Sequence, residues 1–338
     1  MTQTTAACPH AADVPWRAAR LPPGVENVSH AIFGVQAQDA ERAAGAAAEL
    51  RALLTQADGP GHLESMRYVD PEGFHCQVFL AYWLDAAAYQ RWRASPAVDG
   101  WWRALPRDSA VGVWCEAMSL PLTRFQYGAG NDRIAGMVTL TGVEPSTKFG
   151  YWGGYRDRIP ASVEDKFLSP MQQVPAPTER DTRGRRLRVE APDNLCYLRE
   201  GQSWDGAGAE EREVWQREMD ATVTDWVATL RDEPARTGCL SVRFCREWDA
   251  DRDSALERQS QIVFALSLHH IERAARTIPT HLAVKDSFLR MHENATFEPR
   301  MHVWVEMFIL KRGELVADYV NCHPRTGLLP YFEAVEIT

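Results

Sequence analysis

The feature that most constrains the fold is a pattern of six segments that occurs twice. From residue 29 to 118 the hydrophobic spacing follows the order strand, helix, strand, strand, helix, strand. The same order returns from 193 to 310, without close sequence identity between the two stretches. This βαββαβ order is typical of a ferredoxin-like unit. The sequence therefore predicts an α+β fold in which two such units form a dimeric-α+β-barrel-type core with flanking helices.

Helix caps and a turn mark the elements of the first unit. Asp39 and Asp85 each stand where a side-chain oxygen can cap the first turn of a helix. Asp70-Pro-Glu-Gly73 is a turn between two strand-like segments. The expected strands are 31–36, 63–69, 74–82 and 110–115, and the expected helices end near residues 54 and 94.

The second unit is expected to have longer helices, and three further segments lie outside the two units. One helix is expected over 210–231, and a helical region over 271–293 is interrupted around Pro279. The expected strands are 195–199, 240–244, 261–268 and 301–310. The remaining segments are an irregular N-terminal arm (1–28), an insertion (119–192) and a C-terminal extension (311–338).

Charge and cysteine content narrow the class of protein. The net charge of −9 argues against general attraction to nucleic acid or anionic membranes. No apolar run reaches the roughly 18 residues of a membrane helix, and no signal peptide is evident. The seven cysteines are scattered without a C-x-x-C pair, which favours a reduced cytoplasm over a disulfide framework or zinc site. The basic run 183–188 is expected to be a solvated loop.

Two of the ten histidines stand out by their context. His302 begins the apolar run 303–310, and His323 lies in a turn fixed by Pro324 and Gly327. Either could act in chemistry or could be a core histidine bonded to backbone. His281 follows Pro279-Thr280 and is expected to cap or pack. The sequence has no H-E-x-x-H motif or paired acidic cluster, so a zinc or non-haem iron enzyme has little support.

A second candidate is the insertion segment Gly150-Tyr-Trp-Gly-Gly-Tyr-Arg-Asp-Arg-Ile-Pro160. Its glycines and aromatic residues would let the backbone approach a flat ligand, and Arg156 and Arg158 offer hydrogen-bond donors. Alternatively, these arginines could pair with Asp157 and Glu164. No P-loop, Gly-x-Gly-x-x-Gly junction or Ser-His-Asp ordering supports nucleotide hydrolysis, nicotinamide chemistry or a hydrolase triad.

Several of these segments, in order, resemble the haem-containing aldoxime dehydratases over roughly residues 30–330. The specific matches are the segment 150–160 and Tyr319-Val-Asn-Cys-His-Pro-Arg-Thr-Gly327. Supporting matches are Gly34-Val-Gln36, Gly201-Gln-Ser-Trp204, Gly238-Cys239 with Ser241 and Arg243, and Thr280-His-Leu282. The resemblance implies haem b, a ferredoxin-like barrel flanked by helices, a homodimer, and a lyase that converts aldoximes to nitriles with loss of water.

The resemblance also implies roles for individual residues. His302 matches the proximal haem ligand, although Met301-His-Val303 stands where the family usually has Tyr-His-Glu. His323 matches the catalytic distal histidine, and Arg158 the distal arginine. Glu200 occupies the position of a family serine that bonds the oxime hydroxyl. A glutamate there could accept a proton or pair with Arg158, so it is a third candidate catalytic residue.

The implied mechanism is binding of the oxime nitrogen to ferrous haem, with His323 delivering the proton that turns hydroxide into water. Three alternatives remain at this stage. The chain could be a haem enzyme of the same fold that acts on another N–O or N–N substrate, which Glu200 motivates. It could be a non-catalytic haem gas sensor or carrier, or a haem-free ligand-binding protein. The preference for aryl or alkyl aldoximes is left open.

Overall fold

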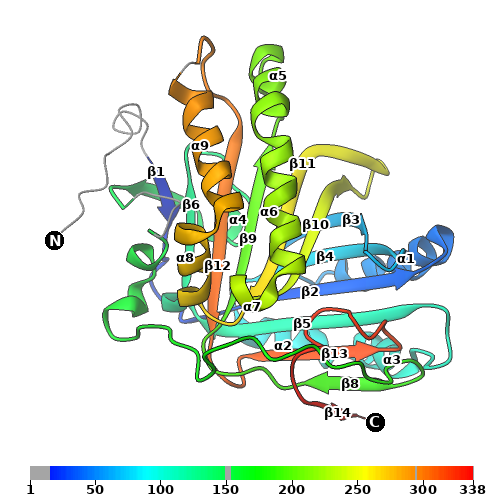
Figure 1. Ribbon diagram of the computed structural model, residues 1–338. Coiled ribbons are helices and arrows are strands. Elements are labelled where there is room, and N and C mark those ends of the chain that lie inside the picture. Colours follow the sequence, from blue (N-terminus) through cyan, green and yellow to red (C-terminus); the bar gives the residue numbers. More distant parts are fainter. Residues whose placement is uncertain (1–15, 149–153, 294, 338) are drawn as a thin grey trace.

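The computed structural model describes residues 16–148, 154–293 and 295–337. In this part of the chain fourteen strands form one sheet (Figure 1). The sheet bends so that side chains from strands of both halves meet on its inner face. The strand order is β14-β8-β13-β5-β2-β4-β3-β10-β11-β9-β12-β6-β1-β7.

The first half follows the predicted order of elements. Its elements are β2 (Asn27–Ala37), α1 (Ala40–Leu54), β3 (His62–Val69), β4 (His75–Trp83), α2 (Ala86–Arg93), α3 (Pro96–Ala104) and β5 (Gly112–Pro121). The predicted caps are confirmed, because Asp39 and Asp85 each accept a backbone N–H of the first turn at 2.8 Å. Gly73 closes the predicted turn with a φ of +82°.

The second half repeats the strand order of the first. Its elements are β9 (Leu195–Ser203), α5 (Ala209–Glu218), α6 (Asp220–Asp232), α7 (Pro234–Thr237), β10 (Cys239–Asp249), β11 (Ser254–Ala265), α8 (Leu268–Thr277), α9 (Pro279–Glu293) and β12 (His302–Leu310). The spatial orders β5-β2-β4-β3 and β12-β9-β11-β10 correspond strand for strand, and the pairing of β3 with β10 joins the halves. The single helix expected over 210–231 is two helices that meet at the buried Met219.

The remaining strands widen the sheet and correct two expectations. They are β1 (Trp16–Ala19), β6 (Phe125–Ala129), β7 (Val143–Ser146), β8 (Arg186–Val189), β13 (Leu315–Val320) and β14 (Ala334–Glu336). The N-terminal arm is regular at residues 16–19, where β1 pairs with β6 and β7. The basic run is no solvated loop, because its end forms β8. Arg186 donates to the Trp102 carbonyl, and Arg188 makes two bonds to Asp318.

A glycine beneath a tryptophan recurs on the inner face of each half. A Cβ on Gly34 of β2 would lie 1.9 Å from the Trp114 ring, and one on Gly201 of β9 would lie 2.1 Å from the Trp304 ring. Each pair joins the first and last strand of its half. The inner face is therefore closely packed along both halves.

Helices cover the opposite, outer face of both halves (Figure 1). Helices α1 to α3 lie on the first half, and α5 to α9 lie on the second. Apolar residues of β9, β12, α6 and α9 share one buried cluster, so α9 packs over this part of the sheet. Within the described residues, no helix combines the length and apolarity needed to cross a bilayer.

Candidate functional site

One row of residues crosses the helix-covered face of the second half, and we call it the site row. Its members are Phe244 on β10, Gln261 on β11, Glu200 on β9, Val305 on β12 and Gly128 on β6, each directly paired with the next. Directly paired residues point to the same face of a sheet. Polar groups therefore stand among apolar ones beneath the helices, which is the arrangement of a binding site.

Arg158 lies at one end of the site row. It ends the short 3₁₀ turn η2 (Arg156–Arg158), and its Nε donates to the Gln126 side-chain oxygen at 2.7 Å. A Cβ on Gly128 would lie 3.1 Å from the guanidinium carbon, so the glycine lets Arg158 approach the sheet closely. The alternative pairing of Arg156 is wrong, because Arg156 forms its ion pair with Glu272 of α8.

Glu200 occupies the middle of the site row, on the same face as Arg158. Two strand spacings separate its Cα from that of Gly128, roughly 10 Å. Burial alone raises the pKa of the Glu200 carboxyl to about 7. Its side chain is half-buried, and no described residue hydrogen-bonds to it. A carboxyl with these properties can donate and accept a proton near neutral pH.

His281 lies in the first turn of α9, among the buried residues that line the helices over this face. Its Nδ1 is 2.8 Å from the Ala275 carbonyl oxygen. Because a carbonyl only accepts, Nδ1 carries the hydrogen and Nε2 carries the lone pair. Burial lowers the pKa of His281 to about 4, so the ring stays neutral. A neutral imidazole with Nδ1–H bonded to a carbonyl is the usual state of a metal-bound histidine.

The sequence interpretation assigned His281 to capping or packing, and the buried ring does pack, edge-on against Trp226 at 4.8 Å. That interpretation did not consider the residue as a candidate ligand. The signal was present in Thr280-His-Leu282, one of the segments that resemble the family. Within the described residues, no group of three His, Cys, Asp or Glu side chains could chelate a metal ion.

His302 points to the inner face, away from the site row. It shares this face with Trp304, on which its ring stacks at 4.7 Å, whereas Val303 and Val305 point to the helices. Its Nδ1 is 2.7 Å from the Asn131 oxygen, and its Nε2 is 3.1 Å from the Tyr127 hydroxyl. Both ring nitrogens of His302 therefore have hydrogen-bond partners in this structure.

His323 lies in the loop after β13, beside the strands of the first half. Its backbone N–H donates to the Gln36 side chain at 2.9 Å, and its ring packs against Phe74. It lines a cavity of about 830 Å³ together with residues that include Asp39 and Arg183. None of these residues belongs to the site row. The structure therefore brings Arg158 and Glu200 to one face, and it places His302 and His323 elsewhere and apart from each other.

The loop with His323 closes one end of the inner face. Gly327, with a φ of +55°, lies against the Glu116 carboxylate. Glu116 accepts two hydrogen bonds of 2.7 Å from Arg243 and a third from the Tyr319 hydroxyl. Leu328 donates its N–H to the same hydroxyl. These hydrogen bonds hold the segment 319–327 against the inner face of the sheet.

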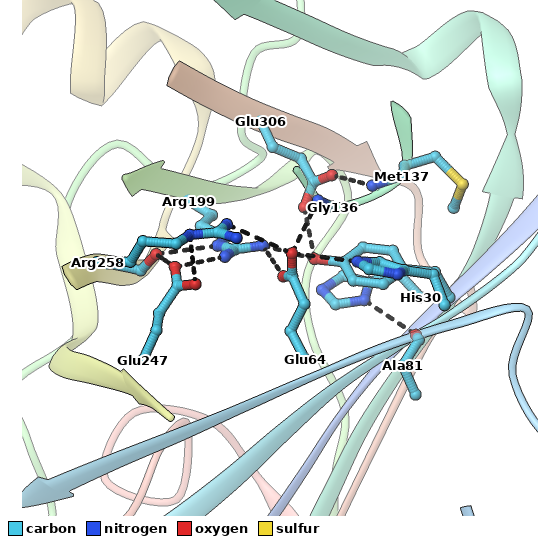
Figure 2. Close-up of polar contacts among 12 residues, drawn as sticks. His30, Glu64, Ala81, Gly136, Met137, Arg199, Glu247, Arg258 and Glu306 are labelled. Carbon is cyan, nitrogen blue, oxygen red and sulfur yellow. Dashed lines mark hydrogen bonds and ion pairs between the residues drawn. The ribbon is translucent and has the colours of Figure 1, made fainter. Parts of the chain in front are cut away.

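A charge network lies on the inner face behind Glu200 (Figure 2). Arg199 forms ion pairs with Glu64 and Glu247, and Arg258 also pairs with Glu247 at 2.9 Å. Glu306 accepts hydrogen bonds from the Tyr82 hydroxyl at 2.9 Å and the Met137 N–H at 2.7 Å. These bonds fix β9 from behind and tie the insertion to the sheet.

The segment 150–160 is only partly described. Residues 150–153 lie outside the described residues, and the structure places its second part, from residue 154, beside β6. Its arginines are therefore the part of this motif that can be assigned to the site.

Comparisons with known proteins show the family to which the chain belongs. The model of a family described as haem-containing dehydratase matches residues 31–328. The chain is 31% identical to the phenylacetaldoxime dehydratase of Bacillus sp. (strain OxB-1), over 94% of this chain and 92% of that one. It is also 31% identical to an aliphatic aldoxime dehydratase of Pseudomonas sp., over 92% and 89%. A crystal structure of an aldoxime dehydratase in complex with butyraldoxime superposes with a TM-score of 0.86 at 26% identity, over 95% and 90%.

Proposed function

The chain belongs to the haem-containing dehydratase family, and from this premise we propose that it is a haem-dependent aldoxime dehydratase, a lyase. It removes water from an aldoxime, R–CH=N–OH, and leaves the nitrile R–C≡N. The observation that supports this most directly is the position of Arg158 and Glu200 on one helix-covered face, in a chain that matches the family along nearly its whole length.

We propose His281 as the residue that holds haem b. Its fixed Nδ1–H tautomer and its neutral state suit an iron ligand. When bound, ferrous haem supplies one open position for the oxime nitrogen and electron density toward the N–O bond. The apolar side chains of β9, β12 and α9 would surround the porphyrin.

Glu200 in the site row transfers the protons, and Arg158 at the end of the row assists it. Arg158 orients the oxime oxygen and stabilises the charge that develops on it as the N–O bond breaks. Glu200, protonated at the start, gives its proton to this oxygen, so that water leaves rather than hydroxide. The resulting carboxylate takes the proton from the oxime carbon as the C≡N bond forms. Glu200 is thereby restored, and the atoms balance without net oxidation. His323 has no place in this scheme.

The test of the ligand compares two histidine variants loaded with haem. His281→Ala should lose the haem absorbance band or shift it strongly, because no described group replaces the imidazole. His302→Gln, the matched control, should retain the spectrum of the wild type. The opposite pattern would assign the iron to His302.

The test of the reaction is anaerobic incubation of the reduced haem protein with aliphatic and aromatic aldoximes, with nitrile measured by chromatography. Arg158→Gln and Glu200→Gln should each lower turnover by about 10²–10⁴-fold with haem retained. His323→Ala should keep most of the activity. If no aldoxime reacts, a panel of other N–O and N–N substrates would test the function that Glu200 first suggested.

The finer architecture belongs to the same proposal. The repeated strand order supports two ferredoxin-like units in a barrel-type core, with the domain limits 29–118 and 193–310 around the insertion. We also propose a homodimer in the cytoplasm, without nucleic-acid or membrane partners. Light scattering after gel filtration would measure the oligomeric state.

A further inference from the structure

Gln261 has no side-chain hydrogen-bond partner among the described residues, and its amide atoms are not fully enclosed by protein. The residue is 2% exposed overall, and it stands in the site row between Glu200 and Phe244. Glu200 beside it is also without a partner. Two adjacent polar groups of this kind point to a ligand that satisfies them.

A cavity of about 420 Å³ opens next to Gln261. Phe244 and Gln259 both line it. Phe244 is the cross-strand neighbour of Gln261 on β10, and Gln259 is its neighbour on the same face of β11. The cavity and the site row therefore share one continuous surface. Two strand spacings, roughly 10 Å, separate Glu200 from Phe244.

Polar and charged side chains form most of the lining of this cavity, and Trp204 and Phe244 are its aromatic members. The Arg246 guanidinium lies over the Trp204 ring, 5.5 Å from its centroid. Arg212 and Glu257 neutralise each other through a bidentate pair. Among the described residues, no carboxylate lies within ion-pair distance of Arg246. Asp220 also lines the cavity, and burial raises the pKa of its carboxyl.

We propose that this cavity binds the substituent of the aldoxime and favours a substituent that ends in a carboxylate. Arg246 would hold the carboxylate, Trp204 and Phe244 would flank the chain or ring, and the Gln261 amide would bond to the ligand beside Glu200. A substituent of arylalkyl size spans the distance from Glu200 to the cavity. The inference rests on the proposed function and names its substrate class.

The test uses the haem-loaded protein and a matched pair of substrates, 4-carboxyphenylacetaldoxime and its methyl ester. Arg246→Gln should lower kcat/KM for the carboxylate by about 10–100-fold, the usual worth of a hydrogen bond to a charged group. The loss should appear as a higher KM. The methyl ester should change less than about twofold, and the exposed variant Arg252→Gln should leave both unchanged. Gln261→Leu should weaken the binding of both substrates.

Several outcomes would overturn the inference. If Arg246→Gln lowered kcat/KM equally for the acid and the ester, or for neither, Arg246 would not select the substrate. Faster transfer of haem from Arg246→Gln to apomyoglobin would assign the arginine to a haem carboxylate instead. If the wild type forms nitrile from neither substrate, the proposed function fails. Binding to the cavity can then still be tested by titration calorimetry with the carboxylated nitrile. A tenfold weaker affinity of Arg246→Gln for this nitrile would support the site, and an equal affinity would overturn it.

Discussion

The two halves of the sheet have the same strand order and the same glycine–tryptophan contact, yet their helix-covered faces differ. The residue before Gly34 is Phe33, which is 2% exposed and packs edge-on against a tryptophan of α2. The residue before Gly201, at the equivalent place in the second half, is Glu200. One position is filled by a core aromatic ring and the other by a carboxyl without a partner.

The cross-strand neighbours differ in the same way. Phe33 pairs with Phe79 on β4, whereas Glu200 pairs with Gln261 on β11. The first half therefore buries apolar side chains at positions where the second half has polar side chains without a hydrogen-bond partner among the described residues. Buried apolar area stabilises a fold, and polar groups without partners destabilise it. At these equivalent positions we therefore expect the first half to contribute more to stability and the second half to supply the reacting groups.

Exchanging residues at the two equivalent positions should have the largest effect. Phe33→Glu would remove a core ring and bury an unpaired carboxyl, so it should lower the free energy of unfolding by about 3–5 kcal/mol or prevent folding. Glu200→Phe should leave the unfolding midpoint unchanged or higher while abolishing nitrile formation. Urea unfolding and nitrile assays measure both variants.

The control for this exchange is Phe33→Leu, which keeps the position apolar and should cost about 1–2 kcal/mol with activity retained. The comparison between the halves breaks down if Glu200→Phe is the more destabilising of the two reciprocal changes. That result would mean that the second half also depends on this position for its packing.

The glycine–tryptophan contacts should give smaller and matching losses. Gly34→Ala and Gly201→Ala each place a methyl group into an indole ring, at about 2 Å, and overpacking of this kind costs about 1–3 kcal/mol. Gly45→Ala in α1 is the control, since its Cβ would meet nothing and alanine favours a helix by about 0.5–1 kcal/mol. Thermal unfolding measures all three. A clear difference between Gly34→Ala and Gly201→Ala would show that the halves are not equivalent on the inner face either.

The elements can be predicted from the sequence more directly than the arrangement of the site, because the two depend on different information. Caps and turns such as Asp39 and Gly73 act over a few residues, so local spacing was sufficient to place them. The face of a strand residue depends on register, where one position reverses the direction of the side chain. His302 and Val303 are adjacent, and only the pairing of β12 with β9 shows which of them points to the helices.

His323 and His281 illustrate a second limit on what can be predicted from the sequence. His323 sits in the more distinctive motif, but that motif is explained by hydrogen bonds that close the inner face. His281 lies in an ordinary helical context, and its value as a ligand comes from a bond to the Ala275 carbonyl, six residues earlier on α8. The motif around His323 could be recognised from its residue types, whereas His281 became a candidate ligand only when its tautomer and burial were known.

The pH dependence of Glu200 should give the smallest effect and the sharpest test of its role. Its folded pKa of about 7 lies above the unfolded value near 4.3, so the folded state binds more protons between these two pH values. Stability should therefore fall as pH rises from about 4 to 7 and then level off. Glu200→Gln should remove this part of the loss. Because Glu200 is only half-buried and solvent screens its charge, the gain in urea unfolding above pH 7 should be on the order of 1 kcal/mol.

The matched control is Glu306→Gln on the inner face, because burial also raises the pKa of Glu306 to about 7. Both variants should flatten the dependence of stability on pH, since both remove a carboxyl that is costly to ionise. Activity should separate them. The wild type and Glu306→Gln should lose turnover as pH rises above about 7, where Glu200 no longer carries its proton, whereas the residual turnover of Glu200→Gln should not change there. A wild-type profile that stays flat through pH 7, with the stability effect present, would leave Glu200 a buried acid without a part in the reaction.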